Sequence, residues 1–241
     1  MDMKSKSRFP STGSGRARAA LGMTALAMLL AATPLAAQTV YTEPWTSSLD
    51  GWSYVQTSCN GTCGHDELLA SDGNPADSVH NAVTGRNKDE IGYWHKSMTW
   101  EAMGVSPGDT VNTVNGQWDD KSVCTAVACA STHQVGIQLY DSSDTAEITA
   151  STVEPLLDVS GDTSSWTTHN PTGAVNVNSG SQASTTTVSI HFNVNPSCGN
   201  NGSAAAEIRA DNFKLTITAS TPSGTQYIIV TELRLPLRTQ D

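Results

Sequence analysis

The chain has 241 residues and a formal net charge of −10 at pH 7, from 13 lysines and arginines against 23 aspartates and glutamates. Such an acidic surface repels nucleic acids and anionic lipid head groups, so neither is expected as a partner. It favours neutral ligands or cations.

The first 37 residues have the pattern of a secretory signal peptide. Five basic residues within positions 4–18 precede an apolar run at 19–32, and the small residues at 34–37 provide a cleavage site. The run is too short to span a membrane comfortably, so we expect cleavage after Ala37, export, and no membrane insertion afterwards. Cleavage removes five basic residues and one acidic residue, which leaves a formal charge of −14.

The remaining chain predicts a single all-β domain over residues 38–220. Ser, Thr, Asn and Gly are abundant, turn dipeptides recur, and no helical period is sustained. Eight or nine strands at these spacings predict a two-sheet antiparallel jelly-roll β-sandwich. Residues 221–241 are a last edge strand, the start of a second module, or a tail.

Strands and polar connections alternate along the domain. We expect a short strand at residues 39–45, an irregular stretch at 57–80 and a polar loop at 119–133. Residues 135–140 and 188–194 alternate apolar and polar side chains, which is typical of half-buried strands.

The most aromatic segment is residues 91–105. Trp94 and Trp100 have the same strand parity, so both are predicted to point into the core, together with Trp52 from an earlier strand. Lys96 has the same parity and is the exception, which suggests a position near an edge.

The last predicted strand of the domain contains a break in parity. Ile208 and Ala210 lie on the opposite face from Phe213 and Leu215, so one regular strand cannot bury all four. A β-bulge at residues 211–212 would shift the register and resolve the conflict.

The five cysteines all follow the signal peptide. Local pairing of Cys59 with Cys63 and of Cys124 with Cys129 would leave Cys198 over, but Cys198 could also cross-link with one of the others. The spacings do not match the Cys-x-x-Cys pairs of structural zinc sites.

Two motifs carry a resemblance to a known superfamily. Leu49-Asp50-Gly51-Trp52 near the start and Ala210-Asp211-Asn212-Phe213-Lys214-Leu215 near the end resemble the galactose-binding-like jelly-roll superfamily, which includes many carbohydrate-binding modules of secreted bacterial enzymes. Residues 94–100 followed by 104–109 resemble its central strand and the turn after it. The resemblance covers about residues 41–217.

The resemblance implies a structural calcium ion. Members often hold one with an early acidic residue and the late aspartate, which nominates Glu43 and Asp211 here. The alternative for Asp211 is a carboxylate that accepts backbone N–H groups at the bulge.

Sugar binding would require aromatic rings outside the core, because pyranoses pack their apolar faces on them. Tyr54, Tyr93, Trp118 and Tyr140 are the candidates, since they are out of phase with core neighbours or lie at strand ends.

No motif identifies a reaction. The six histidines form no pair at the i, i+2 spacing of a strand or the i, i+4 spacing of a helix, and no nucleophile elbow, His-Glu-x-x-His motif or phosphate loop is present. The sequence therefore predicts a secreted, non-catalytic module that binds a polysaccharide or glycan. The alternatives are a glycosidase or polysaccharide lyase of the same fold, or a surface adhesion module.

Overall fold

The computed structural model describes residues 36–43, 45, 46, 48–69, 73, 77–125, 134–158, 165–169, 173–198 and 205–222. In these ranges the only helix is a 3-10 turn at Ser179–Ser181, and no helix is long and apolar enough to cross a membrane. The strands are β1 Ala36–Glu43, β2 Ser53–Leu69, β3 Ser78–Thr99, β4 Thr110–Thr125, β5 Gln134–Asp141, β6 Glu154–Asp158, β7 Thr167–His169, β8 Val175–Asn176, β9 Thr187–Asn195 and β10 Ala205–Ser220.

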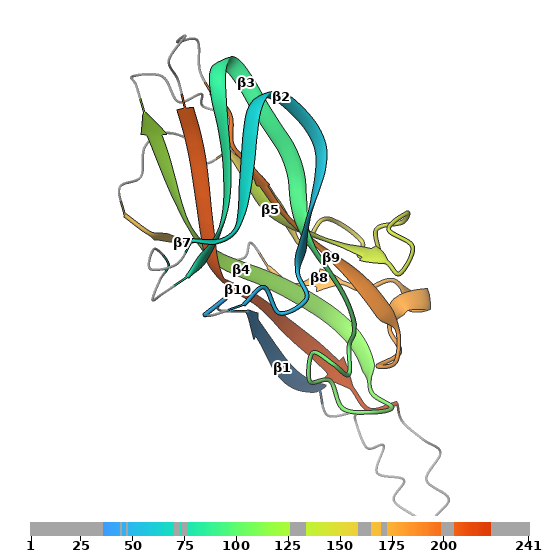
Figure 1. The fold of residues 1–241 in the computed structure, drawn as a ribbon. Helices are drawn as coiled ribbons and strands as arrows, with labels where there is room; N and C mark the ends of the chain where they lie inside the picture. Colours follow the sequence, from blue (N-terminus) through green and yellow to red (C-terminus); the bar gives the residue numbers. More distant parts are fainter. Residues whose placement is uncertain are drawn as a thin grey trace, which may run out of the picture. The chain divides into compact units, whose positions relative to one another are not determined.

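The strands form two layers that share the long strand β3, and every pairing between them is antiparallel. In one layer, β10 pairs with β4, with β1 and with the first part of β3. In the other, β9 lies between the last part of β3 and β5, and β6 pairs with β5. The strand β2 follows β3 along both parts, as a curved pair (Figure 1). The fold is therefore the predicted all-β sandwich, with the short strands β7 and β8 added along β4.

Aromatic side chains join the two layers. Phe192 of β9 and Phe213 of β10 lie with ring centroids 5.4 Å apart, and Trp45 stacks on Phe192 at 6.0 Å. All three side chains are fully buried. Trp94 and Trp100 are buried as well, which confirms the core position that their parity predicts. Among the described residues, the interior between the layers holds one large apolar core and a second, small cluster of Val83, Cys198 and Ala206.

The predicted bulge in β10 is confirmed. Asp211 lies opposite Asp119 and Lys214 opposite Gln117, so β10 has one more residue than β4 between these pairs. Ala210 and Asp211 are buried in succession, which is the change of parity that the sequence requires.

Two expected loops are in fact strands. β2 runs to Leu69 through the stretch that was expected to be irregular, and β4 runs to Thr125 into the expected polar loop. These segments lack apolar alternation, but their backbones pair with β3 and β10. Residues 126–133 lie outside the described part of the chain.

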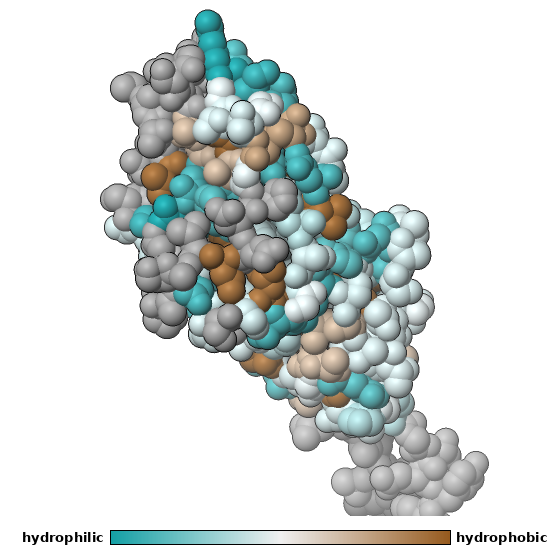
Figure 2. All heavy atoms as spheres, in the orientation of Figure 1, coloured by the Kyte–Doolittle hydropathy of each residue, from teal (hydrophilic) through white to brown (hydrophobic). Residues whose placement is uncertain are grey.

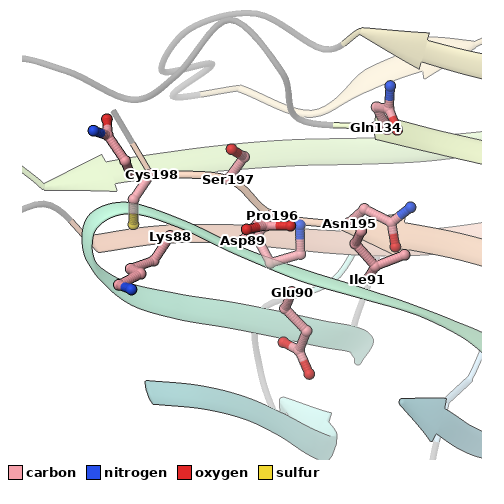
Figure 3. A pocket seen from close by; sticks show the side chains of 10 residues that line it. Lys88, Asp89, Glu90, Ile91, Gln134, Asn195, Pro196, Ser197 and Cys198 are labelled. Carbon is pink, nitrogen blue, oxygen red and sulfur yellow. The ribbon is translucent and has the colours of Figure 1, made fainter. Parts of the chain in front are cut away.

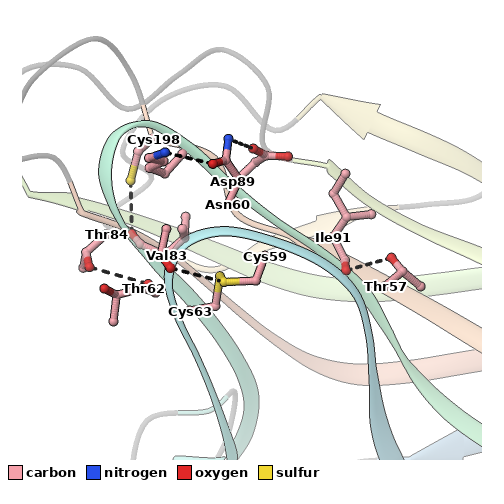
Figure 4. The surroundings of a disulfide bond; sticks show 12 residues. Thr57, Cys59, Asn60, Thr62, Cys63, Val83, Thr84, Asp89, Ile91 and Cys198 are labelled. Carbon is pink, nitrogen blue, oxygen red and sulfur yellow. Dashed lines mark hydrogen bonds between the residues drawn. A yellow bond between two sulfur atoms is a disulfide. The ribbon is translucent and has the colours of Figure 1, made fainter.

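The local disulfide Cys59–Cys63 is present in β2 (Figure 4). Cys198 is a buried thiol that donates a hydrogen bond to the carbonyl of Val83 at 3.1 Å. The side chain of Cys124 and the whole of Cys129 lie outside the described residues, so their predicted pairing stays a prediction.

The ends of the predicted domain are only partly described. β1 begins at Ala36, which lies opposite Ser220 in β10, and Ala37 lies opposite Ala219. Residues 1–35 and 223–241 are outside the described ranges, so the signal peptide, its cleavage after Ala37 and the role of the tail stay predictions.

Candidate functional site

The outer face of the layer formed by β3, β9 and β5 carries a cluster of polar and aromatic side chains. In β9, Ile190 and Phe192 point into the core, so Ser189, His191 and Asn193 point to the opposite face. His191 is nevertheless only 6% exposed. Neighbouring side chains on this outer face therefore cover it.

Two tyrosines cover His191. The ring of Tyr93 stacks on it with centroids 3.7 Å apart and planes 9° apart, and the ring of Tyr140 lies 4.4 Å away at 29°. Tyr93 faces Asn193 across β3 and β9, and Tyr140 faces Ser189 across β5 and β9, so His191 is the diagonal neighbour of both. We call Tyr93, His191 and Tyr140 the ring row.

Hydrogen-bonding side chains lie beside the ring row. The amide nitrogen of Asn193 donates to Oε1 of Gln138 at 3.1 Å, and His95 Nε2 lies 2.6 Å from Ser189 Oγ. The ring row is therefore an aromatic strip flanked by amide, hydroxyl and imidazole groups.

An acidic turn closes one side of the cluster. Asp144 follows β5 and places Oδ1 3.1 Å from His191 Nε2 and Oδ2 3.3 Å from His95 Nε2. The carboxylate of Asp141 accepts hydrogen bonds from the backbone N–H groups of Ser143 and Thr145, at 3.2 and 2.9 Å. Asp144 has a φ of +56°, and these bonds fix the turn in that uncommon conformation.

The local environment shifts the pKa of each titratable member. Burial raises the pKa of Tyr93, with a contribution from Asp144, and burial also raises the pKa of Tyr140. Burial lowers the pKa of His191 in spite of the neighbouring carboxylate. The pKa of Asp144 is lowered, because hydrogen bonds from Ser189 and His191 outweigh the opposing effect of burial. At neutral pH the site thus offers two phenol O–H donors and one carboxylate.

The cluster contains serine, histidine and aspartate but lacks the geometry of a catalytic triad. In a triad the histidine contacts the serine with one ring nitrogen and the aspartate with the other. Here Nε2 of His95 is the atom close to both Ser189 Oγ and Asp144 Oδ2. Ser189 is also fully buried. This arrangement does not support nucleophilic catalysis by Ser189.

The structure brings together two of the four predicted sugar-binding residues. Tyr93 and Tyr140 both belong to the ring row. Tyr54 is half-buried on β2 and packs on Trp94 with ring centroids 5.4 Å apart, and burial next to Glu90 raises its pKa.

The prediction that Trp118 lies outside the core is wrong. It is 1% exposed, and its ring centroid lies 6.0 Å from that of Phe192. Its parity is misleading because β4 contains a register irregularity, which allows both Val111 and Val114 to be buried and puts Trp118 in phase with Val114.

The predicted calcium ligands already have protein partners. Oε2 of Glu43 accepts hydrogen bonds from Tyr41 at 3.0 Å and Trp52 at 3.1 Å, and Lys96 Nζ lies 3.0 Å away. An ammonium group thus occupies the place of a cation at Glu43, so this residue does not fit a calcium site. The backbone N–H of Asn212 donates to Oδ1 of the buried Asp211 at 2.6 Å, as the alternative at the bulge predicts.

A separate hollow of about 410 Å³ lies between β3 and the end of β9 (Figure 3). Its lining residues are Asn87, Lys88, Asp89, Glu90, Ile91, Gln134, Asn195, Pro196, Ser197 and Cys198. Lys88 Nζ donates a hydrogen bond to Oδ1 of Asn60 at 2.8 Å. No aromatic side chain is among the described residues of its wall, so we assign no sugar site to it.

The exposed apolar surface offers no competing site on the face shown in Figure 2. Hydrophobic residues form small separate patches among polar ones there. The large hydrophobic side chains that are exposed in the described ranges are Val40 and Ile91, which belong to different strands. The ring row is therefore the candidate site.

Comparisons with known proteins match the chain only at the level of structure. No family model matches it. No curated protein matches it either. Thirteen solved chains are similar. One is the CBM22-1 xylan-binding domain of Paenibacillus barcinonensis Xyn10C, with 9% identity over 73% of this chain and 92% of that chain and a TM-score of 0.33.

Two other similar structures cover nearly the whole of the matched chain. The C-terminal family 22 carbohydrate-binding module of Clostridium thermocellum Xyn10B has 14% identity, over 76% of this chain and 94% of that one, with a TM-score of 0.33. The K1 cleaved adhesin domain of Lys-gingipain from Porphyromonas gingivalis W83 has 13% identity over 73% and 97%, with a TM-score of 0.36. Carbohydrate-binding modules are thus among the similar structures.

Proposed function

We propose that this protein is an exported, non-catalytic module that binds a polysaccharide or glycan on the outer face of β3, β9 and β5. The observation that carries the proposal is the ring row, in which Tyr93 and Tyr140 stack on His191 from the strands on either side of β9. Because each tyrosine covers His191 with one ring face, the row offers a sugar its ring edges, the two phenol groups and the remaining faces of the two tyrosines.

The groups around the ring row suit the hydroxyls of a sugar. Tyr93 and Tyr140 remain protonated at neutral pH and can donate, while the ionised Asp144 can only accept. The formal net charge of −10 favours a neutral glycan over an acidic one. Calcium is not part of the proposal, because the carboxylate of Glu43 already forms an ion pair with Lys96.

Retention on insoluble polysaccharides tests the proposal directly. We expect the protein to bind at least one of xylan, cellulose, mannan and chitin, and to release no reducing ends from it. Tyr93→Ala and Tyr140→Ala should each weaken binding about tenfold or more, because an aromatic anchor is lost from the centre of the contact. Tyr93→Phe keeps the ring and should retain most of the affinity.

The matched control is Val40→Ala, which shortens an exposed side chain on β1 outside this face. It should bind like the wild type. Circular dichroism of each variant verifies folding. The proposal is wrong if no polysaccharide retains the protein, or if folded Tyr93→Ala and Tyr140→Ala bind as the wild type does.

A further inference from the structure

We propose that His95, His191 and Asp144 form a binding site for one divalent transition-metal ion of the zinc class. The ligand atoms of the three side chains lie within 4.8 Å of one another. Two imidazole nitrogens and one carboxylate are the donors that zinc and its neighbours accept, whereas calcium and magnesium prefer oxygen atoms alone. The inference goes beyond the proposed function, because it requires these three side chains and no sugar.

Two nitrogen–oxygen distances in the cluster are close to the edge of a coordination tetrahedron. With zinc–nitrogen and zinc–oxygen bonds of about 2.1 Å, neighbouring ligand atoms lie about 3.4 Å apart. Nε2 of His95 is 3.3 Å from Asp144 Oδ2, and Nε2 of His191 is 3.1 Å from Asp144 Oδ1. The two distances go to different oxygens of the one carboxylate, so a small rotation of Asp144 and the imidazoles would bring the three side chains onto one ion, with a further position for water.

The sheet register fixes the two histidines. His95 of β3 and His191 of β9 are directly opposite each other, and their ring centroids are 5.7 Å apart. Opposite positions on paired strands keep their side chains at neighbouring distance without any movement of the backbone. Tyr93 stacks on His191 and restrains the plane of its ring.

The third ligand is also held in place before an ion arrives. Asp144 lies in a turn that is stabilised by Asp141, whose carboxylate accepts hydrogen bonds from the backbone N–H groups of Ser143 and Thr145. Preorganised ligands lose little conformational entropy on binding, which favours a specific site over weak, non-specific binding of the ion at the surface.

One contact must change when an ion binds. Ser189 Oγ lies 2.6 Å from the same Nε2 of His95 that would ligate the ion. The hydroxyl must therefore rotate away from this nitrogen. Asp144 and Ser97 lie nearby as alternative hydrogen-bond partners for it.

Calorimetric titration of zinc chloride into metal-stripped, untagged protein tests the site. We expect one zinc ion per chain, and a weakening of at least tenfold in His95→Gln and Asp144→Asn. The matched control is His80→Gln. His80 lies on the part of β3 that pairs with β10 and has its own carboxylate partner, Glu207, at 3.3 Å. This variant should bind zinc like the wild type.

Cobalt provides a second readout that does not depend on the variants. Cobalt(II) in the wild-type site should show the visible absorption of a four- or five-coordinate centre, and zinc should displace it. The proposal is wrong if the wild type binds no zinc at about 1 mM, or if folded His95→Gln and His80→Gln bind it equally. Polysaccharide retention of metal-stripped protein keeps this outcome separate from that of the proposed function.

Discussion

At the scale of single residues, the carboxylate of Asp141 stabilises the turn that carries Asp144, although Asp141 is not itself a member of the site. Its Oδ1 accepts backbone N–H groups from Ser143, Thr145 and Ala146, which fixes the turn around Asp144. The hydrogen bond from the Thr145 backbone is the largest cause that lowers the pKa of Asp141. The ionised form is therefore the form that holds the turn.

This shift predicts an acid-dependent contribution to stability. Because the folded-state pKa of Asp141 lies below the ordinary aspartate value of 3.8, its stabilisation is complete above that value and is lost as pH falls through the lowered pKa. Asp141→Asn should therefore show a smaller fall in Tm than the wild type between about pH 5 and pH 2. Thermal melts over this range measure it.

Ser143→Ala gives an intermediate case, because it removes one of the hydrogen bonds that lower the pKa of Asp141 and keeps the carboxylate. Its fall in Tm with acid should lie between those of the wild type and Asp141→Asn. Identical acid limbs for Asp141→Asn and the wild type would contradict the assignment.

At the scale of elements, the bulge in β10 allows residues before and after it to be buried in the same core although they differ in strand parity. Asn212 takes a φ of +51°, which asparagine tolerates better than most residues, and its side-chain amide donates to Asp119 Oδ2 at 2.8 Å. The bulge therefore has both a backbone and a side-chain cause, and it keeps Ala210 and Phe213 in the same core.

Substitutions at Asn212 separate these two causes. Asn212→Gly loses only the side-chain bond, and should lower the free energy of unfolding by about 1 kcal/mol. Asn212→Ala loses the same bond but keeps a Cβ in the left-handed region, without the polar side chain that makes this conformation tolerable for asparagine, and should lower it by about 2 kcal/mol or more. Urea denaturation measures both values. Equal stability of the two variants would contradict a backbone requirement at this position.

At the scale of the whole molecule, a largely buried ion pair connects the first strand to the shared strand of the two layers. Glu43 ends β1 and Lys96 lies in β3, and their side chains are 5% and 15% exposed. Trp52 donates to the same carboxylate oxygen at 3.1 Å. This junction explains why a lysine can share the parity of Trp94 and Trp100.

Removing one partner of this pair should be costly. Glu43→Gln keeps an acceptor for Tyr41 and Trp52 but leaves the ammonium of Lys96 without its counter-ion, and should lower the free energy of unfolding by about 3 kcal/mol. Glu43→Gln combined with Lys96→Met should recover part of this loss, because no isolated charge remains. A double-mutant cycle in urea measures the coupling.

Strictly additive effects would show that the two side chains do not interact.

The same proteins test the calcium prediction. With Lys96 at Glu43, we expect EGTA to leave the Tm of the wild type unchanged. A fall in Tm that disappears in Glu43→Gln would restore calcium to this position.

Local patterns in the sequence determined the fold class and much of the core. Alternation in residues 188–194 marked β9, the parity of Trp94 and Trp100 marked the core face of β3, and the parity break at 211–212 marked the bulge. These features depend on neighbours within one strand, where the two-residue period alone assigns a side chain to a face.

Tertiary structure decided the site. Tyr93 and Tyr140 were candidates from sequence, but His191 between them, and its approach to His95 and Asp144, depend on the register between strands. His95 and His191 are nearly a hundred residues apart, so no local spacing could pair them. Register is fixed by which apolar faces meet in the core, and a shift of one residue would send every side chain of a strand to the other face.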